Sequence, residues 1–198
     1  MRLCFATNNT HKLTEVRALL PSSVDLVSLV DLGCHEELPE TQDTLAGNAR
    51  QKAEYVWQHY QTACFADDTG LEVNALNGEP GVYSARYAGP QRSAADNIQK
   101  LLHELRGPVD RSARFRTVVA LVLPNGEWHE FHGVVDGLIT AERRGADGFG
   151  YDPVFQPLHH ASTFAQMSLE QKNRLSHRGR AVAQLVAFLQ ELERQVPL

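Results

Sequence analysis

The chain is poor in cysteine, in long apolar runs and in excess basic charge, and each shortage excludes a class of protein. Its three cysteines, Cys4, Cys34 and Cys64, are far apart and form no CxxC pair. Neither a disulfide framework nor a thiolate zinc site is therefore favoured, and a reducing compartment is the simpler expectation. The longest apolar run, VVALVL at residues 118–123, is much too short to cross a membrane.

The charge balance and the opening residues exclude further partners. A formal net charge of −5 argues against a protein that binds nucleic acid, since such proteins usually carry a basic stripe. The first residues, MRLCFATNNTHK, become polar too early for a signal peptide. The apolar content of 42% and charged content of 22% are typical of globular proteins. We therefore expect one cytoplasmic domain over residues 1–198, with no nucleic-acid or membrane partner.

Apolar periodicity predicts strands that alternate with helices. Short apolar runs at residues 3–6 and 63–66 indicate buried strands, and the second of these ends in two aspartates. Helical stripes cover residues 44–60 and 94–105. The segment 113–139 holds two strand-like runs around PNG, which is the strongest hairpin signal in the chain. A hairpin among alternating strands and helices predicts an α/β fold with a mixed sheet flanked by helices.

The stretch CFADDTGLEV places Asp67 and Asp68 side by side after a buried strand. Successive side chains of a strand point in opposite directions, so the two aspartates should have different roles. Mg²⁺ takes carboxylate oxygens together with substrate phosphate oxygens. One aspartate is therefore a candidate to bind Mg²⁺ and activate water, while the other holds the loop or orients a lysine. A simple turn before Thr69 explains one aspartate but not both.

The stretch FATNNTHK joins a strand to a helix and has the geometry of a phosphate-binding turn, because backbone N–H groups of a first helical turn can face an anion. Hydroxyl and amide donors line this turn: Thr7, Asn8, Asn9 and Thr10. Lys12 opposes the helix dipole, which an anion in front of it would explain. An ordinary capped helix with a solvated lysine explains the same residues, and the motif alone favours that alternative. The pattern GxxxxGK[ST] of a P-loop is absent.

Two charged residues near the second predicted helix are less informative alone. Glu40 precedes the helix, where an exposed glutamate usually just favours the helix N-terminus. Lys52 shares the apolar side of this helix with Ala49 and Val56. It either extends its ammonium to solvent or reaches an anion, and the sequence leaves both alternatives open.

Two motifs in the last third of the chain could surround a base. GFGYDP at residues 148–153 offers Phe149 and Tyr151 as stacking surfaces, although an aromatic beside glycine is more often a packed turn. In LSHRG, His177 and Arg178 fall in the first turn of the last predicted helix. Cations at a helix start indicate an electron-rich partner.

Six stretches together resemble the inosine triphosphate pyrophosphatase family, the dITP/XTP pyrophosphatases that remove deaminated purine nucleotides. These stretches are FATNNTHKLTEV, LPET, FADDTGLEV, GVYSARYAG, GFGYDPVF and QKNRLSHRG. They occur in the family's order and extend over nearly the whole chain. FGYDP and SHRG are the most specific of them.

The resemblance implies a fold, a reaction and a set of site residues. The fold would be an elongated mixed β-sheet flanked by helices, with two lobes and a central substrate cleft, assembled as a homodimer. The reaction would be hydrolysis of a purine nucleoside triphosphate between the α and β phosphates, with Mg²⁺. Glu40 and Asp68 would hold the metal, and Asp68 would also be the general base. The implied substrate contacts are Thr7, Asn8, Asn9, Thr10, His11, Lys12, Lys52, Thr69, Phe149, Gly150, Tyr151, Asp152, Lys172, His177 and Arg178.

The sequence departs from the family pattern at three points, and none removes a proposed catalytic residue. Thr69 stands where serine is usual, and Asn8 stands where some members have glycine. In TLAGNA, Leu45 and Gly47 replace the common phenylalanine and glutamate.

The selectivity for deaminated purines has a simple chemical expectation. Donors from His177 or Arg178 would pair with the 6-oxygen of hypoxanthine or xanthine and mismatch the amino group of adenine.

Two rival functions remain: a pyrophosphatase for modified pyrimidine nucleotides on a similar fold, and a nucleotide- or RNA-binding module without catalysis. The acidic balance and the aspartate pair count against the second rival.

Overall fold

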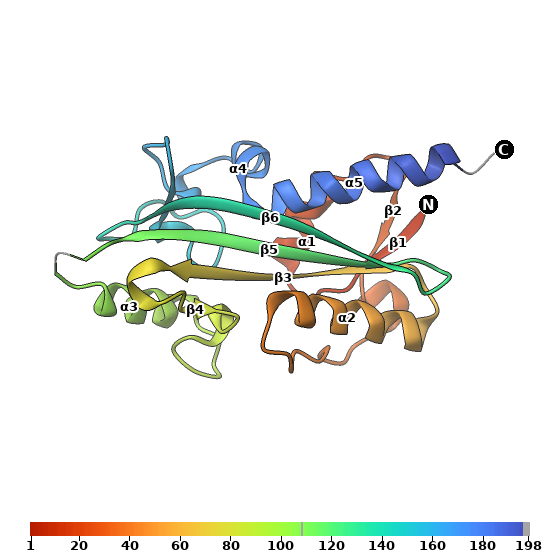
Figure 1. Cartoon of the computed structure of the whole chain (residues 1–198), viewed down its shortest axis with the longest axis horizontal. Coiled ribbons are helices and arrows are strands. Elements are labelled where there is room, and N and C mark those ends of the chain that lie inside the picture. Colours follow the sequence, from red (N-terminus) through yellow and green to blue (C-terminus); the bar gives the residue numbers. More distant parts are fainter. Residues whose placement is uncertain (108, 196–198) are drawn as a thin grey trace. The chain divides into compact units, whose positions relative to one another are not determined.

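The computed structural model describes residues 1–107 and 109–195, and within them seven strands form one mixed sheet (Figure 1). The strand order is β2-β1-β3-β5-β6-β7, and β4 pairs with β3. Pairing of β1 with β2 and with β3 is parallel, whereas β3 with β4 and β6 with β7 are antiparallel. The strands are β1 (Arg2–Phe5), β2 (Asp25–Val27), β3 (Cys64–Val73), β4 (Pro80–Gly81), β5 (Ser112–Val122), β6 (Trp128–Ile139) and β7 (Phe155–Pro157). The predicted α/β fold with a mixed sheet is confirmed.

Five α-helices lie in the described residues: α1 (Thr10–Arg17), α2 (Leu45–Tyr60), α3 (Ala94–Glu104), α4 (Leu169–Leu175) and α5 (His177–Gln195). Short 3₁₀ turns occupy Val30–Leu32, Asn74–Leu76, Ser84–Arg86, Asp152–Val154 and Phe164–Gln166. Side chains cap four helix starts in the described residues, because each accepts hydrogen bonds from backbone N–H groups of the first turn: Asn9, Thr44, Ser93 and Ser168. None of the helices described is long and apolar enough to cross a membrane.

The chain divides into two compact units. Unit 1 comprises Met1–Asp68, Thr117–Gly133 and the residues from Arg178 onward, and unit 2 comprises Thr69–Arg116 and Val134–His177. Strands β3, β5 and β6 contribute residues to both units. A single domain over residues 1–198 stays a prediction.

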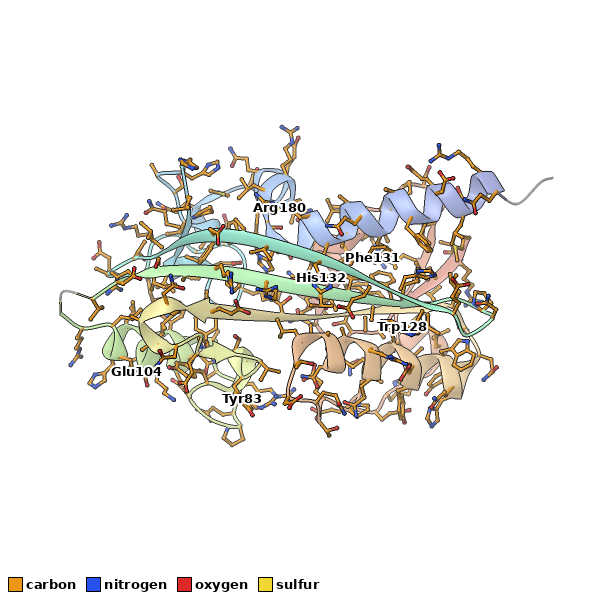
Figure 2. The ribbon with its side chains drawn as sticks, viewed as in Figure 1. Tyr83, Glu104, Trp128, Phe131, His132 and Arg180 are labelled. Carbon is orange, nitrogen blue, oxygen red and sulfur yellow. The ribbon has the colours of Figure 1, made fainter. Side chains whose placement is uncertain are left out.

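Unit 1 buries apolar side chains on both faces of its strands, and Figure 1 shows α2 and α5 on opposite sides of them. Phe5 of β1 and Phe65 of β3 stack with ring centroids 4.6 Å apart, in a core that includes Val182 and Leu185 of α5. Phe131 of β6 belongs to the same core (Figure 2).

The other side of the unit 1 strands faces α2. Its buried stripe includes Ala49, Ala53 and Val56, and the Cys64 thiol donates to the Ala53 carbonyl at 2.9 Å. The guanidinium carbon of Arg50 lies over Trp128 of β6, 4.2 Å from the centroid of the Trp128 ring. Helix α2 is thus held against the strand that carries the aspartate pair.

Unit 2 has its own core, and aromatic rings dominate it. Phe115 of β5 lies 4.6 Å from the ring of Phe155 and 6.1 Å from that of Phe164, measured between centroids. Leu71 of β3 and Leu101 of α3 are fully buried in the same cluster. Apolar packing of Leu71 therefore helps to fix the end of β3 in unit 2.

Candidate active site

The aspartate pair lies inside β3 rather than at its end. The sequence predicted a strand over 63–66 that stops at Asp67, but β3 continues from Cys64 to Val73 between β1 and β5. This part of the prediction is wrong, and the reason is electrostatic. Cationic side chains meet both carboxylates, so the strand can carry the charges in a largely buried position.

Asp67 is the centre of a buried group of four charged side chains in unit 1. Its Oδ1 accepts from Lys12 Nζ at 2.8 Å, and its Oδ2 accepts from Arg178 Nε at 3.0 Å. Arg178 Nη1 also donates to Glu15 Oε2 at 2.5 Å. Lys12 and Arg178 are two positive charges against the two negative charges of Asp67 and Glu15, so this group is neutral. Burial acts to raise the pKa of Asp67, but the charges of Lys12 and Arg178 outweigh it and lower the pKa.

Asp68 belongs to a different group, on the side of α2. Its Oδ2 accepts from Asn48 Nδ2 at 3.1 Å, and its Oδ1 lies 3.9 Å from Lys52 Nζ. Lys52 Nζ also donates to Glu40 Oε1 at 2.7 Å and to the Asp67 carbonyl at 2.8 Å. Each carboxylate thus meets a different set of partners, and the roles of the two aspartates toward metal and water stay predictions.

The Asp68 group carries one more negative charge than positive charge. Glu40 and Asp68 both contact the ammonium of Lys52. Burial, together with the charge of Glu40, raises the pKa of Asp68 despite the nearby lysines. Burial acts to lower the pKa of Lys52, but Asp68 and Glu40 outweigh it and raise the pKa, so Lys52 stays charged.

This donor set fits Mg²⁺. In the described part of the chain, no three His, Cys, Asp or Glu side chains gather as a ready metal-binding group. Mg²⁺ is usually held by only one or two carboxylates, and water and substrate phosphates complete its shell. Glu40 and Asp68 offer two hard oxygen ligands with a residual negative charge, whereas the neutral Asp67 group offers no such charge.

The predicted phosphate turn is well ordered by its own side chains. Asn9 caps α1, and its Oδ1 accepts from the N–H groups of His11 at 3.0 Å and Lys12 at 3.2 Å. Thr7 Oγ1 accepts from Asn9 N–H at 3.2 Å. Helix α1 is thus capped, as expected for an ordinary helix without a bound phosphate. Lys12, however, is not a solvated lysine. Its side chain is only 14% exposed and pairs with Asp67.

In unit 2, the FGYDP motif and Lys172 form a polar group of their own. Asp152 Oδ2 accepts from Lys172 Nζ at 2.6 Å and from Phe149 N–H at 2.8 Å. The ammonium of Lys172 lies 4.8 Å from the centre of the Phe149 ring. Gly148 is required here, because it has a φ of +74° and a Cβ would lie 2.1 Å from Asp152 Oδ2.

Tyr151 and His177 are packed more deeply than a stacking role requires. Tyr151 is part of the unit 2 core, and its hydroxyl donates to the Ser84 carbonyl at 2.9 Å. The His177 ring stacks on Phe115 with centroids 4.5 Å apart. Tyr151 is thus part of a packed turn, as expected for an aromatic side chain without a stacking role. Phe149, in contrast, is half-buried, and the ammonium of Lys172 lies over its ring.

The predicted site residues fall into the two units. In unit 1 the structure brings Lys12 and Arg178 to Asp67. It also brings Lys52, which binds Glu40, to Asp68. In unit 2 it brings together Phe149, Asp152 and Lys172. The remaining predicted residues are Thr7, Asn8, Asn9, Thr10 and His11 in unit 1, and Thr69, Gly150, Tyr151 and His177 in unit 2. Their roles toward a substrate stay predictions.

The sequence analysis missed three residues that shape the site. Glu15 sits beside Val16 on the buried side of α1, and Asn48 sits beside Ala49 on the buried side of α2. A polar residue inside an apolar stripe was the available signal for both. Gly47 was seen only as a departure from the family pattern. A Cβ at this position would lie 2.7 Å from the Cβ of Gln42, so the glycine lets the preceding loop approach α2.

Known proteins are similar to this chain over nearly its whole length. The model of the Ham1 family matches residues 3–188. A protein named dITP/XTP pyrophosphatase from Flavobacterium johnsoniae is 53% identical over 189 residues, covering 96% of this chain and 98% of that protein. One of the same name from Porphyromonas gingivalis is 54% identical, covering 95% of this chain and 97% of that protein.

Two solved structures have the same fold. The Ham1 protein of Staphylococcus aureus matches with a TM-score of 0.88 and 40% identity, covering 97% of this chain and all of that one. A HAM1 protein from Coxiella burnetii matches with a TM-score of 0.88 and 38% identity, covering 96% and 99%. The resemblance inferred from the six motifs is confirmed, and the chain belongs to the Ham1 family.

Proposed function

We propose that this chain is a Mg²⁺-dependent pyrophosphatase that hydrolyses ITP, dITP and XTP to the monophosphate and pyrophosphate, and so removes deaminated purine nucleotides from the precursor pool. The names of relatives that match it over nearly their full length support the reaction. The observation that carries the proposal is the Asp68 group, in which two carboxylates share one lysine and keep a net negative charge.

The proposed chemistry needs little beyond positioning, charge neutralisation and an oriented water. Bound Mg²⁺ would supply charge neutralisation on the triphosphate, held by Glu40 and Asp68. Asp68 takes the proton of the attacking water. Lys12 and Lys52, fixed by Asp67 and Glu40, present two further positive charges for phosphate oxygens. The turn at residues 7–11 would supply neutral donors.

The purine would be read by unit 2 and the start of α5. Phe149 offers a ring face, and Lys172 is held by Asp152 as a directed donor. His177 and Arg178 are proposed donors to the 6-oxygen, with Thr69, Gly150 and Tyr151 as neighbouring contacts. A site that requires such a donor pair rejects a base with an amino group by a factor of about 10⁴.

The assembly and location belong to the same proposal. We infer a homodimer in the cytoplasm that acts on a free nucleotide and not on nucleic acid. The net charge of −5 supports the last point. Light scattering on the purified chain measures the mass directly, with 22.0 kDa expected for one chain and twice that for the dimer.

The function is tested by following pyrophosphate release from dITP, dATP, dTTP and UTP. The proposal predicts release from dITP with Mg²⁺ and none with EDTA, and little release from dATP. Faster hydrolysis of dTTP or UTP would favour the pyrimidine alternative. Tight binding of dITP without pyrophosphate release under all metal conditions would favour a binding module.

A further inference from the structure

The loop that carries Glu40 is attached to α2 by two side chains of that helix. Asn48 Oδ1 accepts from the Gln42 N–H at 2.9 Å. One turn later, Gln51 Oε1 accepts from the Thr41 N–H at 3.0 Å, and Gln51 Nε2 donates to Thr41 Oγ1 at 2.8 Å. The backbone immediately after Glu40 therefore depends on α2 for its position.

Asn48 differs from Gln51 because its amide nitrogen contacts Asp68. Its Nδ2 donates to Asp68 Oδ2 at 3.1 Å, and the side chain is almost completely buried. The orientation of this amide is fixed by chemistry, because the backbone N–H of Gln42 needs an acceptor and the carboxylate of Asp68 needs a donor. One side chain thus spans from the Glu40 loop to Asp68.

Close approach of the loop to this helix turn is possible because residue 47 is glycine. A Cβ at Gly47 would lie 2.7 Å from the Cβ of Gln42 and 3.0 Å from Thr44 Oγ1. Gly47 and Asn48 act on the same residue of the loop, Gln42. The first provides space for it and the second binds it.

We propose that Asn48 is a positioning residue that sets the relation between Glu40 and Asp68 and thereby the affinity of the site for Mg²⁺. The proposal rests on the proposed function, since it takes these two carboxylates as the metal ligands. Asn48 itself touches neither metal nor substrate in this account. Residues that orient metal ligands in this way typically change metal affinity by about 10–100-fold when replaced.

The test compares Asn48→Ala with Gln51→Ala. Both variants remove a side-chain anchor of the same loop from the same helix, but only Asn48 contacts Asp68. Mn²⁺ is used as a probe of the Mg²⁺ site, and the free ion is measured by electron paramagnetic resonance without nucleotide. We expect Asn48→Ala to weaken Mn²⁺ binding by about tenfold or more, and Gln51→Ala to weaken it less than threefold.

Kinetics provide a second readout. The Mg²⁺ concentration for half-maximal dITP hydrolysis should rise with Asn48→Ala, whereas the KM for dITP at saturating Mg²⁺ should change little. In a double-mutant cycle, Asn48→Ala should have little further effect on Mn²⁺ binding once Glu40→Gln is present. Asn48→Ser serves if the alanine variant does not fold, as judged by circular dichroism.

The outcomes separate the two proposals. Equal Mn²⁺ affinity in folded Asn48→Ala and the parent chain overturns the role of Asn48, and so does an equal loss in Gln51→Ala. If the parent chain binds Mn²⁺ but releases no pyrophosphate from any purine nucleotide, the proposed function fails while the role of Asn48 at the metal site can still stand.

Discussion

Asp67 and Asp68 are adjacent in β3, yet their carboxylates belong to two separate groups of charged side chains. Asp67 is bound by Lys12 and Arg178, in a group whose charges cancel with Glu15. Asp68 is bound by Asn48 and lies near Lys52, which it shares with Glu40. The first carboxylate completes a buried ion-pair network, and the second leaves a negative charge for a ligand to neutralise.

Asp67→Asn should be strongly destabilising. It removes one negative charge and leaves the buried cations of Lys12 and Arg178 with one carboxylate between them. Breaking a buried ion pair by removal of one partner costs about 3–5 kcal/mol of unfolding free energy. Urea unfolding at pH 7 without divalent ions measures this, and a loss below about 1 kcal/mol would contradict the assignment.

Asp68→Asn should preserve the stability of the metal-free protein but reduce its turnover of dITP. It removes the repulsion between Asp68 and Glu40, which together with burial raises the pKa of Asp68, so the metal-free protein should be as stable as the parent chain or more stable. Turnover of dITP should fall by a factor of about 10² or more, because the proton acceptor is lost. Nucleotide binding measured by calorimetry should persist. Retained turnover would show that another group is the base.

Gly47→Ala should impair the Mg²⁺ dependence of activity while changing stability little. Alanine favours the helix over glycine by about 1 kcal/mol, which opposes the cost of moving the loop. The new Cβ would meet the Cβ of Gln42 at 2.7 Å, so the loop that carries Glu40 must shift. We expect a higher Mg²⁺ concentration for half-maximal activity with little change in melting temperature. Gln58→Ala, at an exposed position of α2, is the control and should change neither quantity.

His177→Ala should reduce the preference for dITP over dATP, by about tenfold or more if its donor reads the 6-oxygen. The ratio of kcat/KM for the two nucleotides measures this, and an unchanged ratio would remove His177 from base recognition. His132→Ala on β6 is the control (Figure 2), since this histidine is partly exposed and pairs with Glu130. Arg178→Ala is a poorer test, because it also leaves Asp67 and Glu15 without a shared partner.

Cys4 and Cys64 should be inert in the folded protein. Burial raises the pKa of Cys4 to about 12, and burial also raises the pKa of Cys64. At pH 8 the thiolate fraction of such a group is about 10⁻⁴, and the thiolate is the reactive form. Ellman's reagent should therefore label Cys4 and Cys64 only after denaturation. Rapid labelling of Cys4 or Cys64 in the native chain would contradict their burial.

Much of the fold was predictable because it follows from periodicity. The stripe at residues 44–60 became α2 over Leu45–Tyr60, and the runs around PNG became β5 and β6. The length of β3 was not predictable in this way. Its charged pair indicated a strand end, and only long-range partners such as Arg178, 111 residues from Asp67, make those charges tolerable.

Sequence motifs predicted which residues belong to the candidate site, but they did not predict which of these residues contact each other. Lys12 was expected to face a bound anion or solvent, and the anion that it meets is the carboxylate of Asp67. Glu15 and Asn48 carry no motif, and their importance arises only when α1, α2 and β3 pack together. Single-residue signals of this kind are lost within apolar stripes until the tertiary contacts are known.

A divalent ion should bind at Glu40 and Asp68 and not at Asp67. The decisive experiment is anomalous scattering from crystals grown with Mn²⁺ and a non-hydrolysable dITP analogue. We expect a peak within coordinating distance, about 2.0–2.5 Å, of carboxylate oxygens of both Glu40 and Asp68. A peak on Asp67, or an ion bound to the nucleotide with neither Glu40 nor Asp68 among its ligands, would contradict it.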